Sequence, residues 1–112
     1  MGEVKYKVLL SNEVVEFLKS LNPKAVKKIA SVIDYVAGGE MNTDYFKKLE
    51  GTDIWEFRTL FAGIQYRLLA FWDTRENALI ITTHGFIKKT QKTPQKEIEK
   101  AERKRKEYFN RK

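Results

Sequence analysis

The sequence predicts an α+β domain in which helices pack on one face of a mainly antiparallel sheet. Residues 12–21 and 23–37 repeat apolar side chains every three or four positions, as amphipathic helices do. Residues 54–84 instead contain three strand-like runs separated by turn signals, of which the first alternates and the last is an apolar run. A chain of 112 residues can form one domain with a substantial core, so we expect residues 1–112 to be a single domain.

The amino-terminal part predicts a short strand followed by a helical hairpin. Residues 5–10 alternate weakly and favour a strand. Ser11 or Asn12 can begin the first helix, because a side-chain oxygen at that position accepts from free backbone amides. Pro23 is tolerated in the first turn of the second helix, and the glycine pair at 38–39 ends it. We expect the apolar stripes of both helices to face the core.

The remainder of the chain supplies the sheet and a last helix. Residues 40–52 predict a polar connection with a short helical turn at residues 45–49. Three strands are then expected, over residues 54–61, 64–72 and 78–84, with a hairpin turn at Ala62-Gly63 and a second turn at residues 73–77. Pro94 begins a final helix. The predicted order is strand, two helices, three strands and helix, which is typical of an α+β domain.

The positive charge is concentrated at the carboxyl end. The chain has a net charge of +7, and residues 85–112 account for all of it, with eleven Lys and Arg against four Asp and Glu. This asymmetry favours a polyanionic partner, with nucleic acid as the first candidate. The alternative is a well-solvated basic tail without a specific partner.

Composition also excludes several classes of protein. The chain has no cysteine and one histidine, which excludes disulfides and disfavours a zinc site, so we expect no metal and no cofactor. No apolar run approaches the length of a membrane span, and the amino terminus lacks the pattern of a signal peptide. We therefore expect a cytoplasmic protein without a membrane partner.

Charged side chains of the predicted sheet are expected to share one face. Trp55 and Phe57 are the residues to bury, so strand alternation predicts that Glu56 and Arg58 face outward. Arg67 lies on the next strand and can approach them in cross-strand register. His84 is expected at the end of the third strand, and the lysines that follow it are expected at the edge of the same charged face.

This set of side chains suits cleavage of an RNA phosphodiester. A carboxylate can take a proton from the 2′-hydroxyl, arginine can bind phosphate oxygens through two hydrogen bonds, and imidazole can return a proton to the leaving 5′-oxygen. Structural alternatives remain for each residue. Glu56 and Arg58 can form an ordinary surface ion pair, His84 can be a hydrogen-bonding residue at a strand end, and the lysines can belong to a solvated loop.

The most specific motif is HGFIKKTQKTP, from His84 to Pro94. Together with WEFR at residues 55–58, YR at residues 66–67, and EI at residues 97–98 followed by Ala101, it resembles the phage-derived HigB-type toxins of the RelE/ParE superfamily. The resemblance implies a RelE-like fold and a toxin of a type II toxin–antitoxin module. Such toxins cleave mRNA, usually on the ribosome, and a helix-turn-helix antitoxin of the HigA kind neutralises them. It also implies metal-independent cleavage that leaves a 2′,3′-cyclic phosphate or a 3′-phosphate.

The resemblance further implies roles for individual residues. Arg67 matches the arginine that contacts the scissile phosphate, Glu56 lies in the strand that supplies a general base in some relatives, and His84 stands near a general-acid histidine of YoeB-like toxins. Lys88 and Lys89 correspond to a phosphate-binding segment; the tyrosine that follows this segment in RelE is missing here, so either lysine is an alternative proton donor. The expected catalytic residues are Glu56, Arg67, His84 and Lys88, and the expected RNA-binding residues are Arg58, Lys89, Gln91 and Lys92.

Two other functions stay open on the same scaffold. One is a non-cleaving inhibitor, as ParE-like members poison gyrase, and the other is an inactive module that binds RNA or an antitoxin. The carboxylate of Glu56 within a basic face favours cleavage, because a protein that only binds would not require it.

Overall fold

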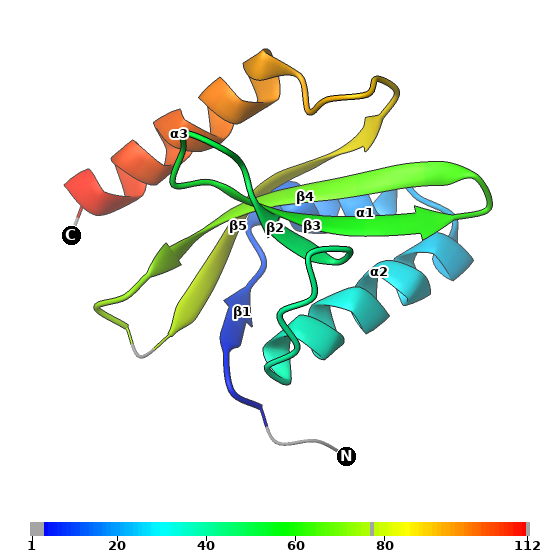
Figure 1. Cartoon of the computed structure of the whole chain (residues 1–112), viewed down its shortest axis with the longest axis horizontal. Helices are drawn as coiled ribbons and strands as arrows, with labels where there is room; N and C mark the ends of the chain where they lie inside the picture. Colours follow the sequence, from blue (N-terminus) through cyan, green and yellow to red (C-terminus); the bar gives the residue numbers. More distant parts are fainter. Residues whose placement is uncertain (1–3, 77, 112) are drawn as a thin grey trace.

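The computed structural model describes residues 4–76 and 78–111, and within them it has the predicted α+β architecture (Figure 1). The elements are β1 (Lys7–Leu9), α1 (Asn12–Lys19), α2 (Pro23–Ala37), β2 (Phe46–Lys48), β3 (Trp55–Phe61), β4 (Ile64–Asp73), β5 (Leu79–Lys88) and α3 (Gln95–Asn110). The strands form one sheet in the order β1-β5-β4-β3-β2, in which β1 pairs with β5 in parallel and the other pairings are antiparallel. None of the described helices is both long and apolar enough to cross a membrane.

The helical hairpin forms as predicted and covers one face of the sheet. Ser11 caps α1, since its Oγ accepts from the backbone N–H of Val14 at 3.1 Å, and Asn22 caps α2 through the N–H of Lys24 at 2.8 Å. The buried stripe of α2 packs with α1 against the side chains of β3 and β4 that point toward this face. Its members are Ala25, Ile29, Val32 and Val36.

The carboxyl-terminal helix lies on the opposite face of the sheet, which corrects the expectation that all helices share one face. Ala101 of α3 packs with Leu69 and Phe71 of β4 in a second core, separate from the core beneath α1 and α2. Asp73, buried at the end of β4, accepts a hydrogen bond from the Tyr108 hydroxyl at 2.7 Å. Hydrogen bonds from the Arg75 side chain lower the pKa of Asp73 to about 2, so this anchor of α3 stays ionised above that pH.

Residues 45–49 do not form the expected helical turn; they contribute the edge strand β2 instead. The ring of Phe46 is fully buried, with its centroid 4.9 Å from that of Trp55 and 4.5 Å from that of Phe57. Burial of this aromatic cluster favours an extended strand beside β3, so tertiary packing overrides the local pattern. The hairpin turn at Ala62-Gly63 forms as predicted, whereas the expected turn at residues 73–77 includes Asn77, which lies outside the described residues.

Strand β5 continues to Lys88 and does not end at His84, as the sequence had suggested. Ala70 pairs with Thr82 whereas Leu69 pairs with His84, so Thr83 is an extra residue in a β-bulge. One extra residue reverses which side chains point to which face of a strand. Downstream of the bulge, His84 therefore faces α3, while Gly85 faces α1.

Gly85 allows α1 to pack directly on the backbone of β5. A Cβ at this position would lie 2.4 Å from Cδ2 of Phe17 and 2.7 Å from Cδ2 of Leu68, which is closer than atoms can approach. We predict that Gly85→Ala lowers the free energy of unfolding by about 1–3 kcal/mol, the usual cost of overpacking, as measured by urea denaturation.

A double-mutant cycle separates this steric effect from a change in strand propensity. In a Phe17→Leu background the clashing ring atoms are absent, so Gly85→Ala should cost less there than in the wild-type protein. Equal costs in both backgrounds would show that contact with Phe17 is not the reason for the glycine.

Candidate functional site

Two arginines lie side by side on adjacent strands and share one carboxylate. Arg58 of β3 and Arg67 of β4 are direct register partners, an arrangement in which like charges repel. Glu56 lies between them, with its Oε1 3.6 Å from Nε of Arg58 and 3.4 Å from Nε of Arg67. The repulsion is thus partly neutralised by one negative charge, and the group as a whole remains cationic.

Neighbouring groups fix the orientation of Arg67. Its Nη2 donates to Oε1 of Gln65 at 2.6 Å, and its Nη1 donates to the Tyr66 carbonyl at 3.1 Å. The Glu56 carboxylate also accepts from the Thr93 hydroxyl, which ties the loop before α3 to this group. Burial lowers the pKa of Arg67, and the charge of Glu56 opposes that shift.

The Nε atoms of both arginines keep unused hydrogen-bonding capacity. Among the described residues, neither the buried Nε of Arg58 nor that of Arg67 makes a hydrogen bond of normal geometry, although both lie near Glu56. A buried donor without a partner is costly unless a ligand or water satisfies it. Such donors on two adjacent cations suit an anionic ligand.

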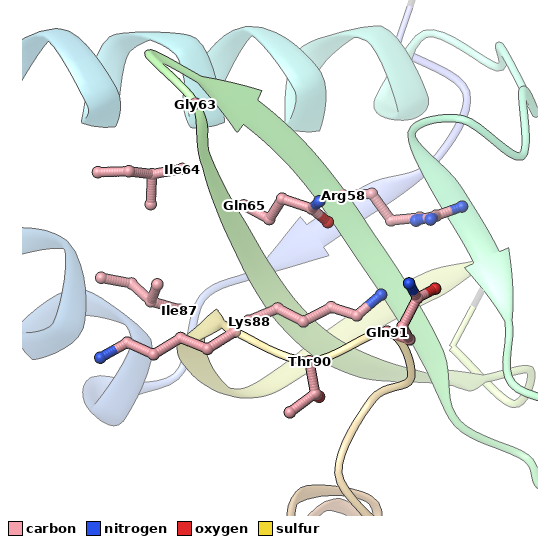
Figure 2. A pocket seen from close by; sticks show the side chains of 9 residues that line it. Arg58, Gly63, Ile64, Gln65, Ile87, Lys88, Thr90 and Gln91 are labelled. Atoms are coloured by element: carbon pink, nitrogen blue, oxygen red, sulfur yellow. The ribbon is translucent and has the colours of Figure 1, made fainter.

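An open pocket of about 750 Å³ lies beside Arg58 of the arginine pair (Figure 2). It lies between the β3–β4 hairpin and the segment that leaves β5, with Ile64 and Ile87 at one side and Arg58 and Gln91 at the other (Figure 2). The residues that line it are Arg58, Gly63, Ile64, Gln65, Ile87, Lys88, Lys89, Thr90 and Gln91. Its polar lining is therefore dominated by basic and amide side chains, which suit phosphate.

The surroundings of Lys88 affect its ionisation. It ends β5 opposite Gln65 in the register of the sheet. Burial lowers the pKa of Lys88, the charge of Arg67 adds to this shift, and the Glu56 carboxylate opposes it. An ammonium with a lowered pKa gives up its proton more readily than an ordinary lysine, so Lys88 is suited to proton transfer.

Three residues expected on an outward-facing surface, Glu56, Arg67 and His84, are buried. Glu56 is 3% exposed and His84 is 2% exposed, because α3 and the loop that precedes it cover this face of the sheet. Nε2 of His84 lies 3.0 Å from Oε1 of Glu97 in the first turn of α3, and Nδ1 lies 3.0 Å from the Thr83 hydroxyl. The histidine is thus enclosed beneath α3 and does not line the pocket beside the arginines.

The other predicted residues occupy three settings. Arg58, Lys88, Lys89 and Gln91 meet in the same pocket, as expected. Arg67 is 3% exposed, so it does not face out freely as the sequence had suggested, but it reaches a smaller adjoining pocket. Lys92 lies in the exposed loop beyond, where its backbone carbonyl accepts from the Thr90 hydroxyl at 2.6 Å.

Sequence reasoning missed three polar residues that belong to this group. Gln65 accepts a hydrogen bond from Arg67, and Thr93 donates one to Glu56. Lys47 lies opposite Glu56 on β2, and its charge contributes to the lowered pKa of Lys88. Lys47 follows the buried Phe46 in β2, but two exposed lysines stand in succession there, so the sequence has no alternation that would have revealed this strand.

Across residues 4–76 and 78–111, no three His, Asp or Glu side chains come together in a way that could hold a metal ion.

Residues 16–106 match the family model described as phage derived protein Gp49-like (DUF891). The chain belongs to the Gp49-like family. None of the curated protein sequences matches this Gp49-like chain significantly.

Solved structures share the fold of the Gp49-like chain at low sequence identity. A mutant of the Escherichia coli toxin RelE in the free state has a TM-score of 0.63 and 13% identity, covering 89% of this chain and 97% of its own. The archaeal RelE–RelB complex from Pyrococcus horikoshii has a TM-score of 0.57 and 21% identity, covering 80% and 99%. The toxin–antitoxin complex RelBE2 from Mycobacterium tuberculosis has a TM-score of 0.50 and 21% identity, covering 76% and 93%. The predicted RelE-like fold is therefore confirmed.

The buried imidazole gives a direct test of this site. Burial lowers the pKa of His84 below its ordinary value of 6.5, and the hydrogen bond to Glu97 opposes the shift. Between the folded pKa of His84 and 6.5, the unfolded chain binds a proton that the folded chain does not. The free energy of unfolding should therefore fall as the pH drops from 6.5 toward the folded pKa. His84 is the single histidine of the chain, so its NMR titration needs no assignment, and we predict a midpoint below 6.5.

Two controls bracket that titration. The urea-unfolded protein should titrate near 6.5, and Glu97→Gln should lower the folded midpoint further, because it removes the carboxylate that stabilises the imidazolium. A midpoint above 6.5 in the folded wild-type protein would mean that attraction to Glu97 outweighs burial.

Proposed function

We propose that this protein is the toxin of a type II toxin–antitoxin system and inhibits translation by cleaving mRNA. The observation that carries the proposal is the pair Arg58 and Arg67, held by Glu56 beside an open basic pocket that contains Lys88. The RelE-like fold supports it, because the structures that share this fold include a free toxin and two complexes of toxins with antitoxins. The motifs around residues 55–58, 66–67 and 84–94 support a HigB-type member in particular.

The arginine pair is suited to the charge of the transition state. As the RNA 2′-oxygen attacks phosphorus, negative charge grows on the non-bridging oxygens, and preorganised guanidiniums stabilise it. Arg58 and Arg67 are held in register on neighbouring strands, so they need little rearrangement to bind one phosphate. Lys89 and Gln91 contribute further phosphate contacts from the loop, and Lys92 adds charge at its rim.

Lys88 is our candidate for the proton donor. In the proposed reaction the bond from the 2′-oxygen to phosphorus forms, the 2′-hydroxyl proton passes to water, and the bond to the 5′-oxygen breaks. Lys88 gives its proton to that 5′-oxygen, which leaves a 2′,3′-cyclic phosphate and a free 5′-hydroxyl. The lowered pKa of Lys88 and its place in the pocket both support this role.

Glu56 and His84 are assigned positioning roles in place of direct catalysis. The carboxylate of Glu56 is occupied by two arginines and Thr93, so it orients the phosphate-binding groups. His84 joins β5 to the first turn of α3 through Glu97 and thereby fixes the loop between them. That loop carries Lys89 and Gln91, so a change at His84 should act on binding through their placement.

The translating ribosome is the setting we propose for cleavage, and a HigA-like helix-turn-helix protein is the antitoxin we propose. The pocket is open to solvent, so it can receive a strand that a larger particle presents. The two RelE-like complexes support an antitoxin partner, and the cytoplasm follows as the compartment from the mRNA substrate.

Arg67→Lys tests the phosphate-binding assignment. The variant keeps a positive charge near Glu56 but loses the planar group that can bind two phosphate oxygens at once. We predict that cleavage falls by roughly 10²–10³-fold, comparable to loss of one preorganised donor in an active site. Primer extension on cellular mRNA after a brief pulse of expression should show new 5′ ends within coding regions for the wild-type protein and far fewer for Arg67→Lys.

Thermal unfolding of Arg67→Lys is the necessary control, because Arg67 is buried and its replacement alters the charge balance around Glu56. Normal cleavage by a folded Arg67→Lys would refute the assignment. Growth arrest without new 5′ ends in the wild-type experiment would exclude cleavage and favour a non-cleaving inhibitor, such as a ParE-like gyrase poison.

Lys88→Arg distinguishes a proton donor from a phosphate ligand. Arginine keeps the positive charge but does not release its proton at accessible pH. We therefore predict that kcat falls by roughly 10²–10⁴-fold while KM changes little, as measured with programmed ribosomes. Lys88→Met should lower kcat and also raise KM, because it removes the charge as well.

Lys89→Met is the matched control for Lys88. Lys89 lines the same pocket but is exposed, so its loss should affect KM more than kcat. If Lys88→Arg retains the full kcat, Lys88 binds phosphate and another group supplies the proton.

A further inference from the structure

The basic pocket is one end of a longer groove. It shares Arg58 and Gln65 with a second pocket of about 430 Å³, which also contains Arg67. The second pocket in turn shares Lys28, Val32 and Tyr45 with a third, of about 210 Å³. The three hollows therefore adjoin one another in a row, from the loop after β5 to the surface of α2.

The groove crosses the sheet edge because β2 is short. Strand β2 pairs with β3 at residues 55–57, and the last backbone hydrogen bond recorded on this side runs from the Arg58 N–H to the Tyr45 carbonyl at 2.8 Å. In the described part of the chain, no strand pairs with residues 59–61 on that side. The second pocket lies along this unpaired edge, with Thr59 and Leu60 in its lining.

An exposed aromatic side chain lies at the far end of the groove. Tyr35 of α2 is 42% exposed, and its ring contacts that of Tyr45 edge to face at a centroid distance of 5.1 Å. That contact supports the Tyr35 ring, and the exposed part of the side chain is open to a planar ligand. Ser31 and Lys28 complete the lining beside it.

The polar side chains along the groove favour a polyanion. Along the groove, Lys28 lies beyond Arg58, Arg67 and Lys88. The acidic residue in the lining of the three pockets is Asp44. A carboxylate repels phosphate but accepts hydrogen bonds from the amino group of a base. Phosphates therefore fit beside the cations, while a base edge fits beside Asp44.

The spacing on α2 corresponds to several nucleotides. Lys28 and Tyr35 lie seven residues apart, which is two helical turns or about 10 Å. Bases stacked at roughly 3.4 Å intervals would cover that length with about three nucleotides. The basic pocket at Lys88 adds room beyond them.

We propose that this groove binds a single strand of RNA over several nucleotides, with one base stacked on Tyr35, at a distance from the cleavage pocket. The inference extends the proposed function, because it adds a subsite for nucleotides that flank the scissile phosphate. A base on an aromatic platform is bound without strong sequence preference, whereas the edge beside Asp44 favours a base with an amino group.

The experiment measures binding of fluorescein-labelled 2′-O-methyl oligoribonucleotides of two to eight nucleotides by anisotropy. The 2′-O-methyl group blocks attack by the 2′-oxygen, so binding is observed without cleavage. For the wild-type protein, affinity should rise with length until the oligonucleotide reaches Tyr35 and then level off. Tyr35→Ala should lower the affinity for the longer oligonucleotides by roughly 5- to 100-fold, the effect of losing one stacked base. The affinity for the shortest ones should stay unchanged.

Conservative and distant substitutions complete the design. Tyr35→Phe keeps the ring and should bind within about twofold of the wild-type protein. Met41→Ala removes an exposed apolar side chain outside the groove, and Lys24→Ala removes an exposed lysine one turn before Lys28; neither should alter the length dependence. Lys28→Ala, in contrast, should lower the affinity for the longer oligonucleotides and reduce the salt dependence of their binding.

The outcomes separate this inference from the proposed function. Equal binding by Tyr35→Ala and Met41→Ala, or no binding of any oligonucleotide to the wild-type protein, would refute the proposal that the groove binds RNA, even if primer extension shows cleavage. Length-dependent binding that requires Tyr35, without new 5′ ends in cells, would support the groove and refute cleavage.

Discussion

The structure depends on a carboxylate that holds two arginines side by side. Removing one partner from a buried ion group typically costs about 3–5 kcal/mol, because the remaining charge is left without compensation. Glu56 makes the approach of Arg58 and Arg67 possible, and Thr93 connects the same carboxylate to the segment before α3. The cationic site therefore rests on one side chain, which also helps to place the segment before the last helix. Because two guanidiniums share a single carboxylate, positive charge is left over, and a phosphate can supply the missing negative charge.

The sheet brings these groups together through two irregular features. The bulge at Thr83 turns His84 toward α3, and Lys88 extends the same strand to the rim of the pocket. The short β2 leaves part of β3 without a neighbour on one side, so the surface beside the arginines continues around the edge of the sheet. One irregularity thus places the groups that suit phosphate chemistry, and the other opens a path that leads away from them.

Much of the fold could be predicted from the sequence, because its local signals agree. The caps at Ser11 and Asn22, the apolar stripe of α2 and the turn at Ala62-Gly63 all act over a few residues. The burial of Glu56 could not be predicted from alternation, which distinguishes two faces of a strand but cannot tell that α3 covers the second. The bulge, the strand β2 and the enclosure of His84 depend on contacts between distant segments. The basic pocket was predictable in part, because Lys88, Lys89 and Gln91 lie close together in the chain, whereas Gln65 joins it through strand register.

The extra residue at Thr83 bears on how this chain is compared with its relatives. Side chains before and after the bulge follow opposite parity, so Ile81 and His84 face the same layer although they are three positions apart. A relative with a regular strand would carry the equivalent of His84 one position earlier. An ungapped alignment would then pair His84 with a residue of the relative that points to the other layer. Motifs from the two halves of β5 should therefore be aligned separately, with the gap placed at the bulge. Sequence identity computed without that gap would understate the similarity of the two sites.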